Sequence, residues 1–482
     1  MIRTLFICIL ISLASTVFSQ EQERPNVLFI AIDDLNDWVG VMKGHPQALT
    51  PNIDALAKSG MLFTNAHCQA PICGPSRASI MTGLYPTTSG NYLQLHDTAI
   101  KKSNDKSAKS IFLPDYFEQH DYKTMGVGKI YHHGDAAKTF EEYGSAWEMF
   151  GPKPAKRFHY NPEWYGKPKG TQTDWGAYPT MDSLMPDYKS ARWAMERLNQ
   201  AHEKPFFLAV GFVRPHVPWY VPQKWFDKFP VEEIQLPPYL AEDLDDIPAF
   251  GQQVTDVPMM PTTKWLIETG QWKNMVQAYL ACIHFVDAQV GKVLDALKES
   301  AYADNTIVVL WSDHGYHLGE KNRVAKQALW ERDTKTVLII KELDATPGRV
   351  SNKPVQLLDM YPTLVDLCGL PTNQQNEGHS LSPLLNHPNS DNWPHLAISS
   401  FGKNNMAITD ERFRLIQYED HSIEFYDLQE DPNEWENLAH RKEYQPEIKR
   451  LQAAIPKEQA ALSKYSRFNL NDYWRNIIKA NK

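Results

Sequence analysis

Residues 26–34 read Asn-Val-Leu-Phe-Ile-Ala-Ile-Asp-Asp, a continuous apolar run that ends in two adjacent carboxylates. Such a run is typical of a strand buried on both faces of a mostly parallel sheet. Two further runs follow the same pattern, over residues 206–212 and 307–311, and each leads at once into polar residues. In open α/β sheets, ligands bind at the edge where the carboxyl ends of the strands meet. The polar residues after these runs are therefore predicted to line a ligand site.

Helical patterns separate the predicted strands. Residues 50–60 begin with Thr-Pro and end with Gly, which are a typical helix start and stop. Apolar residues recur at helical spacing from Trp272 to Leu297, which predicts a long amphipathic helix. This alternation predicts an α/β fold with a large, mixed, mostly parallel sheet sandwiched by helices.

The pattern changes after about Asn386. Three short apolar runs separated by turn residues predict a small antiparallel sheet, and a charged helix is predicted beyond them; the ranges are 406–409, 413–418, 423–428 and, for the helix, 443–463. We therefore predict a large α/β domain over residues 20–385 and a C-terminal α+β subdomain over 386–482. Residues 151–180, rich in Pro, Gly and aromatic residues, are predicted to form a long insertion over the site.

Composition and the N-terminus exclude several classes of protein. The chain has 482 residues, of which 42% are hydrophobic, enough for a substantial core. Its net charge of −9 argues against a nucleic-acid-binding protein. Residues 1–19 carry Arg3, an apolar run and small residues before Gln20, as in a cleaved secretory signal peptide. That run is too short to span a membrane and no later one is long enough, so we expect a soluble periplasmic or secreted protein.

Cysteine usage is thin. Beyond the signal peptide the chain has Cys68, Cys73, Cys282 and Cys368, too few for a disulfide scaffold. If Cys73 is set aside for chemistry, at most one bridge among the other three is possible. The chain also lacks any Asn-x-Ser/Thr acceptor. Because a eukaryotic secreted enzyme of this size usually offers several, a bacterial origin is the better expectation.

Residues 73–83 read Cys-Gly-Pro-Ser-Arg-Ala-Ser-Ile-Met-Thr-Gly. This pattern predicts a short helix with Cys73 at its start, Pro75 in its first turn and Gly83 just past its end. An anion at Cys73 would meet free backbone N–H groups, the positive end of the helix dipole and the guanidinium of Arg77. The alternative is a buried core cysteine, as most cysteines are.

The motif Cys-x-Pro-Ser-Arg-x-x-x-Met-Thr-Gly resembles the signature of the type I sulfatases of the alkaline phosphatase superfamily. In that family a maturation enzyme oxidises the cysteine to formylglycine (3-oxoalanine), so the resemblance implies an aldehyde at position 73. A hydrated aldehyde carries two hydroxyls, one to attack sulfur and one to expel sulfate afterwards. Residues 50–54 and 426–438 also resemble family motifs, and further details resemble the branch that contains iduronate sulfatase.

Two pairs of residues at strand ends suggest a metal. Asp33 and Asp34 repel each other unless a cation or an arginine lies between them, although a loop or helix-cap pair is the alternative. With Asp313 and His314 they form an oxygen-rich set that suits a hard cation such as Ca²⁺. The resemblance implies that these four residues and residue 73 bind one Ca²⁺. Many relatives have Asp-Asn where this chain has Asp313-His314.

The resemblance assigns the remaining catalytic residues. It places Lys129 and Lys326 on the sulfate, His132 on the formylglycine hydroxyl and His216 on the leaving oxygen or the sulfate. His133 is a competing assignment for His132, because it follows directly in the sequence. Together these groups supply positive charge around the sulfate oxygens and an acid near the departing oxygen.

The sequence thus predicts a calcium-dependent, formylglycine-containing sulfatase that acts on a sulfated carbohydrate such as ulvan, carrageenan or a glycosaminoglycan. One alternative is a phosphodiesterase or phosphonate monoesterase of the same fold, although those relatives usually carry more metal ligands. Another is an inactive protein that binds sulfated glycans. Candidate sugar contacts are Trp38, His45, Tyr92, Trp219 and His317.

Overall fold

The computed structural model describes residues 24–133, 138–147, 149–159, 172–467 and 471–481. The predicted signal peptide lies outside these residues. Within the described part of the chain, no helix has both the length and the apolar character that crossing a membrane requires.

A nine-stranded sheet forms the centre of the described structure. The strands lie in the order β10 (Arg349–Ser351), β2 (Met61–His67), β9 (Lys335–Lys341), β8 (Thr306–Ser312), β1 (Asn26–Ile32), β6 (Phe206–Phe212), β3 (Lys123–Gly128), β4 (Glu142–Tyr143), with β11 (Val355–Gln356) beside β2. β9 runs antiparallel to both its neighbours, and all other pairs are parallel. The three strands predicted first are thus adjacent, with Ile30 of β1 between Val210 and Leu310. This confirms the predicted mixed, mostly parallel sheet.

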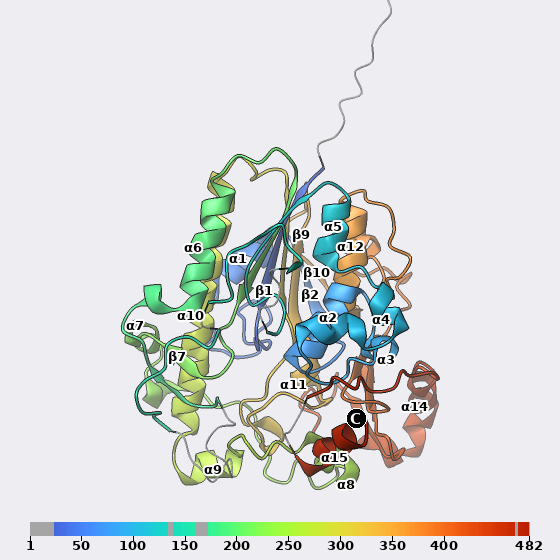
Figure 1. Cartoon of the computed structure of the whole chain (residues 1–482). Helices are drawn as coiled ribbons and strands as arrows, with labels where there is room; N and C mark the ends of the chain where they lie inside the picture. The colour runs from blue at the N-terminus through green and yellow to red at the C-terminus, as the bar shows by residue number, and fades with distance from the viewer. Residues whose placement is uncertain (1–23, 134–137, 148, 160–171, 468–470, 482) are drawn as a thin grey trace, which may run out of the picture.

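Helices cover both faces of this sheet (Figure 1). One face carries α1 (Pro51–Ser59), α6 (Pro186–Leu198) and α10 (Trp272–Glu299), and the other carries α2 (Cys73–Thr82), α5 (Leu113–Gln119) and α12 (Met360–Leu367). Successive side chains of a strand point to opposite faces, so β1 contributes to two cores. Leu28, Ile30 and Ile32 belong to the first core, while Val27 and Phe29 belong to the second.

The C-terminal part contains the predicted antiparallel sheet, with one strand more than predicted. Its strands are β12 (Ala397–Ser400), β13 (Met406–Thr409), β14 (Phe413–Gln417) and β15 (Ile423–Asp427). The charged helix predicted over 443–463 is wrong in length, because α14 spans only Gln445–Gln452. Pro456 lacks a backbone N–H and disfavours helical geometry at Ile455 before it, so the helix stops ahead of this pair.

The other elements are short. They are α3 (Pro86–Ser89), η1 (Asp97–Lys102), α4 (Asp105–Lys109), β5 (Trp175–Ala177), η4 (Asp182–Leu184), β7 (Trp219–Val221), α7 (Gln223–Phe226), η5 (Val231–Glu233), α8 (Ala249–Thr255), α9 (Thr263–Glu268), η6 (Glu320–Asn322), α11 (Glu331–Thr334), η7 (Leu357–Asp359), α13 (Ser382–Asn386), η8 (Leu438–His440), η9 (Lys442–Tyr444) and α15 (Asp472–Ala480). Of the predicted insertion over residues 151–180, the segment 160–171 lies outside the described residues, and β5 pairs with β7.

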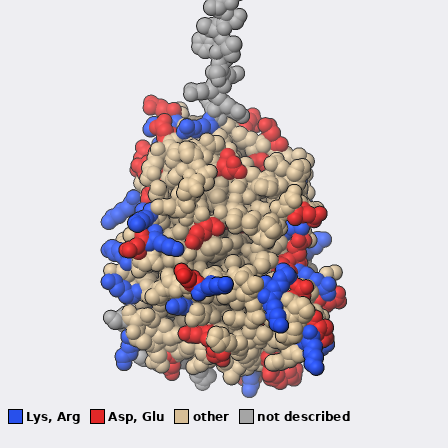
Figure 2. Space-filling view, turned by 90° about the vertical axis from the view of Figure 1, so that its right-hand side faces the viewer, with Lys and Arg blue, Asp and Glu red and all other residues tan. Residues whose placement is uncertain are grey.

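Charged side chains of both signs are interspersed over the face shown in Figure 2. No large patch of a single sign forms on this face, so it offers no basic surface of the kind that nucleic-acid binding needs.

Candidate active site

The predicted site residues converge at the carboxyl edge of the sheet. Asp33 and Asp34 follow β1, Lys129 follows β3, His216 lies beyond the end of β6, and Asp313 with His314 comes at the end of β8. Cys73 and Arg77 reach the same place from α2, and Lys326 from the loop after η6. Asp34 has a φ of 61°, a left-handed conformation that Asp tolerates better than most residues and that directs its carboxylate into the site.

Cys73 opens helix α2, as predicted. Gly83 ends that helix in the left-handed conformation, with a φ of 70°, and its N–H donates to the carbonyl of Ser79. The Cys73 thiol is almost fully buried, with its Sγ 3.0 Å from Lys326 Nζ, 3.3 Å from His314 Nε2 and 3.8 Å from Asp34 Oδ1. Burial and the charge of Asp33 raise the pKa of this thiol well above its ordinary value. The unmodified cysteine is therefore kept protonated in this environment.

Arg77 forms ion pairs with the carboxylates of Asp313 and Asp33. Its Nε donates to Asp313 Oδ2 at 2.8 Å, and its Nη2 lies 3.4 Å from Asp33 Oδ1. Its Nη1 donates to the backbone carbonyls of Lys129 and Ile130. The guanidinium thus fixes the strand ends of β1, β3 and β8 relative to α2, which makes Arg77 a positioning residue in this structure.

Two lysines bring positive charge to the thiol. Lys129 Nζ donates to Asp33 Oδ2, and Lys326 Nζ donates to Asp34 Oδ1 at 2.5 Å. Burial opposes the charge of Lys326, but Asp34 and Cys73 outweigh it and raise the pKa of this amine well above its ordinary value. Burial also raises the pKa of Asp33, but Lys129, His216 and Arg77 hold it well below the ordinary range. Both lysines are therefore cationic at neutral pH.

The donor set fits a divalent cation. Asp33, Asp34, Cys73 and His314 each offer one ligand atom, and these atoms all lie within 4.8 Å of one another. Asp34 Oδ2 is buried without a hydrogen-bond partner, as expected of an oxygen that a cation would contact. His314 Nδ1 lies 2.9 Å from the Gly315 carbonyl and must donate to it, which leaves the lone pair on Nε2 facing the cluster.

Asp313 stands slightly apart from this group. Its Oδ1 accepts a hydrogen bond from the Asp34 N–H at 3.1 Å and lies 3.6 Å from His314 Nε2, while its Oδ2 pairs with Arg77. The three carboxylates and the cations Arg77, Lys129 and Lys326 balance in charge. A divalent ion added to this cluster gives it net positive charge, which suits an anionic substrate.

His216 faces the same cluster, with its Nε2 3.9 Å from Asp34 Oδ2. Its Nδ1 lies 2.6 Å from the Val217 carbonyl and donates to it, so Nε2 is the nitrogen directed into the site. Burial and the charge of Lys326 lower the pKa of His216 well below its ordinary value. The imidazole is therefore neutral here until an anion enters.

The structure distinguishes His132 from His133. The ring of His132 lies beside Gly74, the neighbour of Cys73, and its Nε2 is 3.1 Å from Gln94 Nε2. The side chain of His133 is 37% exposed and its ring stacks on His96. This arrangement favours His132 for contact with residue 73. Gln94 was missed by sequence reasoning, because nothing in the local pattern marks it.

The five candidate sugar contacts are buried at or below 4% exposure. The Trp38 ring packs on His45 and Tyr279, and Trp219 packs on Tyr279 and Tyr316. His317 Nδ1 pairs with Asp333 at 2.6 Å. These contacts are those of core packing, so the structure does not support a sugar-binding role for them.

The thiols of Cys68, Cys73, Cys282 and Cys368 are all free.

Fold and site together define a hydrolase of the alkaline-phosphatase-like class. A family model described as sulfatase matches residues 25–370, and one described as N-sulphoglucosamine sulphohydrolase, C-terminal, matches residues 319–461. The chain is 47% identical over 465 residues to a sulfatase of Formosa agariphila, covering 94% of this chain and 91% of the relative. It is 29% identical over 409 residues to mouse iduronate 2-sulfatase, covering 72% and 69%. The chain belongs to the sulfatase family, and it is a sulfatase enzyme.

Solved structures show the same fold. One, determined in complex with its substrate D-glucosamine-2-N,6-O-disulfate, has a TM-score of 0.71 at 21% identity and covers 95% of this chain and 99% of its own. A phosphonate monoester hydrolase of Agrobacterium radiobacter has a TM-score of 0.70 at 21% identity, covering 89% and 94%. At this level of identity the likeness concerns the fold alone.

Proposed function

We propose that this protein hydrolyses sulfate esters on a carbohydrate, with formylglycine formed from Cys73 as the nucleophile and one Ca²⁺ beside it. The observation that carries the proposal is the position of Cys73 Sγ, within 3.8 Å of an amine, an imidazole and a carboxylate of the metal-like cluster. A maturation enzyme is the partner that this modification requires.

The environment of Cys73 supports a modified residue. A thiol is a good nucleophile only as the thiolate, and burial raises the pKa of this one well above its ordinary value. The unmodified side chain would therefore attack poorly. A hydrated aldehyde at this position supplies one hydroxyl for attack and one for the release of sulfate.

The side chains around residue 73 would divide the remaining work. Lys129 and Lys326 are buried cations, and each is already directed at the cluster, so they can bind the oxygens of the sulfate. His216 presents Nε2 to the same space. An anion bound there favours the protonated imidazole, which can then give its proton to the leaving oxygen. His132, beside Gly74, is positioned to exchange a proton with residue 73.

Asp33, Asp34, Asp313 and His314 would hold the cation, with an oxygen of residue 73 as a further ligand. When bound, Ca²⁺ supplies Lewis-acid polarisation of the sulfate ester and stabilises negative charge near it. Carboxylate oxygens are the ligands that Ca²⁺ prefers.

Two alternatives remain distinct from this proposal. Phosphoesterases and phosphonate hydrolases of this fold usually hold more metal ligands, whereas one group of metal-binding residues is found among the described residues. An inactive protein that binds sulfated glycans would be expected if Cys73 stayed unmodified. Mass spectrometry of the peptide that contains Cys73, isolated from the native host, tests the inactive alternative, because the modification replaces a thiol with an aldehyde.

Activity on aryl sulfate and aryl phosphate supplies the second test. We expect faster turnover of the sulfate and its loss in Cys73→Ala. An intact thiol in host material, faster phosphate turnover, or full activity in Cys73→Ala would each contradict the proposal. The Cys282→Ala variant is the matched control, because that thiol is buried in the core formed with α10 and lies outside the site.

Substrate, compartment and domain boundaries belong to the same proposal. A sulfated polysaccharide or its oligosaccharides is the favoured substrate. The printed names of two similar proteins, iduronate 2-sulfatase and the protein bound to D-glucosamine-2-N,6-O-disulfate, refer to sulfated sugars. We propose export to the periplasm or the medium of a bacterium after cleavage ahead of Gln20, which N-terminal sequencing of the mature protein checks. We also propose a catalytic domain over residues 20–385 and a C-terminal subdomain over 386–482.

A further inference from the structure

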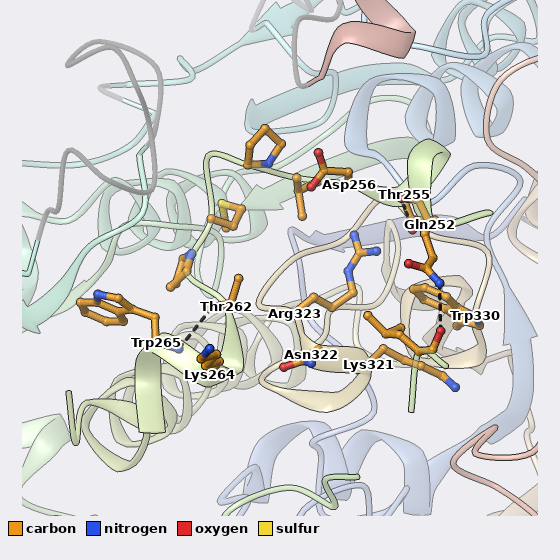
Figure 3. Close-up of a pocket in the computed structure, with 15 residues that line it drawn as sticks. Gln252, Thr255, Asp256, Thr262, Lys264, Trp265, Lys321, Asn322, Arg323 and Trp330 are labelled. Atoms are coloured by element: carbon orange, nitrogen blue, oxygen red, sulfur yellow. Dashed lines mark hydrogen bonds between the residues drawn. The ribbon is translucent and has the colours of Figure 1, made fainter. Parts of the chain in front are cut away.

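A pocket is lined by residues 321–323, which precede Lys326 in the chain, and Arg323 of this pocket donates to the Lys326 carbonyl. Its volume is about 650 Å³, within the range usual for small-molecule sites. Its walls come from the loop between α8 and α9, from α9 and from residues 321–323 (Figure 3). It includes Asp256, Thr262, Trp265 and Trp330. Apolar and aromatic side chains therefore share the walls with polar and charged ones, which can fix the orientation of a ligand.

Arg323 is the charged group at the centre of this pocket. In the view of Figure 3, the Arg323 side chain extends away from Thr262 and toward the side of the pocket where Asp256 and Gln252 lie. The residue is 6% exposed, and its Nε is buried without any hydrogen-bond partner. Its Nη2 donates to the Lys326 carbonyl at 2.6 Å, and the guanidinium lies over the Trp330 ring at 5.5 Å. Within the described part of the chain, no carboxylate lies within 4.0 Å of it.

Two other buried arginines near the site pair with carboxylates, whereas Arg214 donates to three backbone carbonyls. Arg77 pairs with Asp313 and Asp33, and Arg332 pairs with Asp37 and Glu320. Despite burial, which acts in the opposite direction, these carboxylates raise the pKa of both guanidinium groups. Burial lowers the pKa of Arg323, because the more distant Asp333 and Asp256 do not offset it. A buried, charged guanidinium without a carboxylate partner is costly, and an incoming anion would remove that cost.

The pocket lining also contains two lysines, and each of them lies close to a carboxylate. Lys321 is committed, because its Nζ donates to Asp243 at 2.6 Å and to the Glu434 carbonyl. Lys264 lies at the rim with a 77% exposed side chain, 3.8 Å from Glu268. Within the described lining, Arg323 is therefore the buried cation that pairs with no carboxylate, although the Asp256 carboxylate also lines the pocket.

The pocket and the sulfate site are close enough for one substrate to occupy both. Arg323 and Lys326 are three positions apart in the sequence, so their Cα atoms are at most about 11 Å apart. Lys326 Nζ lies 3.0 Å from Cys73 Sγ, so the segment 323–326 runs from the pocket to the side chains around residue 73. A second anionic group on the same or the neighbouring sugar could thus reach Arg323 while its sulfate ester lies at residue 73.

From this geometry we infer that Arg323 is a specificity-determining residue, which binds a second anionic group of the substrate, a carboxylate or a further sulfate, in the pocket beside the scissile sulfate. This inference rests on the proposed function and narrows its substrate to polyanionic carbohydrates. Arginine offers planar, paired N–H donors that match both kinds of oxygen anion.

The test compares Arg323→Gln with the parent enzyme on three substrates. 4-Nitrophenyl sulfate has no second anion, D-glucosamine-2-N,6-O-disulfate has a second sulfate, and a 2-O-sulfated hexuronate disaccharide has a carboxylate. We expect Arg323→Gln to lower kcat/KM about 10- to 100-fold for at least one saccharide, mainly through KM, and to leave the aryl sulfate within about twofold. Comparison of the two saccharides shows whether sulfate or carboxylate is bound.

Two further variants keep the result interpretable. Arg323→Lys retains the charge and should recover part of the lost affinity, whereas Lys264→Gln removes an exposed charge of the rim and should change KM little. An equal loss on all three substrates would assign Arg323 to positioning Lys326 and overturn the inference, as would no loss on any. Parent enzyme that hydrolyses aryl sulfate but neither saccharide also overturns it. Parent enzyme inactive on every sulfate ester contradicts the proposed function itself.

Discussion

Arg77 and Asp313 form a buried ion pair, with 2.8 Å between Nε and Oδ2 and side chains that are at most 1% exposed. The pair joins α2 to the end of β8, and the same guanidinium reaches Asp33 at the end of β1. It therefore holds α2, which begins at Cys73, against two of the strands that present the candidate metal ligands.

Replacement of Arg77 by Gln should destabilise the protein strongly. Removal of one partner of a buried pair leaves uncompensated charge and typically costs about 3–5 kcal/mol. Urea unfolding measures this loss. Arg192→Gln is the control, because its side chain is 69% exposed beside Glu196 and should cost at most about 0.5 kcal/mol. Equal stability of the two variants would show that the Arg77 pair does not hold the site together.

His132 and His133 should differ in their importance for turnover. His132→Ala removes the imidazole beside Gly74 and should lower kcat on aryl sulfate by about 10²–10⁴-fold, as for a general acid or base. His133→Ala removes an exposed ring and should stay within a few-fold of the parent. Steady-state kinetics of the two variants on aryl sulfate tests this difference. A larger fall in kcat for His133→Ala than for His132→Ala would assign the proton-transfer role to His133.

Gly211 of β6 should not tolerate a side chain. A Cβ at this position would lie 2.2 Å from the backbone carbonyl carbon and oxygen of Lys129. Gly211→Ala must therefore displace the Lys129 backbone, and we expect a loss of about 1–3 kcal/mol together with a large fall in kcat. Val210→Ala is the comparison, since it weakens the core of the same strand without touching Lys129. Full kcat in folded Gly211→Ala would refute the importance of this close approach.

Stability should depend on pH through Asp359. Burial raises the pKa of this carboxyl to about 7, although it accepts hydrogen bonds from the N–H groups of Gln356 and His379. Between about pH 4 and 7 the folded state keeps a proton that the unfolded chain releases. The stability that this proton contributes is present at low pH and is lost as the pH rises through 7.

Asp359→Asn should remove this part of the pH dependence. The difference in free energy of unfolding between parent and variant, measured by urea at pH 5 and pH 8, should shift in favour of the variant at pH 8, by about 2–3 kcal/mol. Asp366→Asn, at an exposed position within α12, is the control variant and is measured in the same way. A pH-independent difference between parent and Asp359→Asn would show that the carboxyl is charged throughout this range.

Calcium should stabilise the folded protein. A ligand that binds only the native state raises its stability with concentration. We expect a chelator to lower the Tm, and Ca²⁺ to restore it more fully than Mg²⁺, which demands a stricter octahedral geometry. Asp34→Asn should abolish the response to Ca²⁺, because it removes a central ligand oxygen. A Tm that changes with neither chelator nor Ca²⁺ would argue against the metal site.

The sequence alone determined the sheet centre and most of the proposed site. Continuous apolar runs predicted β1, β6 and β8, because strands covered on both faces need no alternation. Polar residues directly after those runs marked Asp33, Asp313 and His314, since strand ends share one edge. The motif that begins at Cys73 predicted the start and the end of α2. Each of these signals lies within a short stretch of sequence, so it can be recognised without knowing how the rest of the chain packs.

Tertiary structure decided what local patterns do not contain. The charged helix after residue 443 is short, and β12 was not predicted, because its short run depends on pairing with β13. Gln94 reaches His132, and Arg77 binds carboxylates of two strands, through contacts between distant segments. Arg323 looks like any surface arginine in the sequence. Only packing of the α8–α9 loop over residues 321–323 buries it and leaves its Nε without a partner, because burial and hydrogen bonding are properties of the assembled chain.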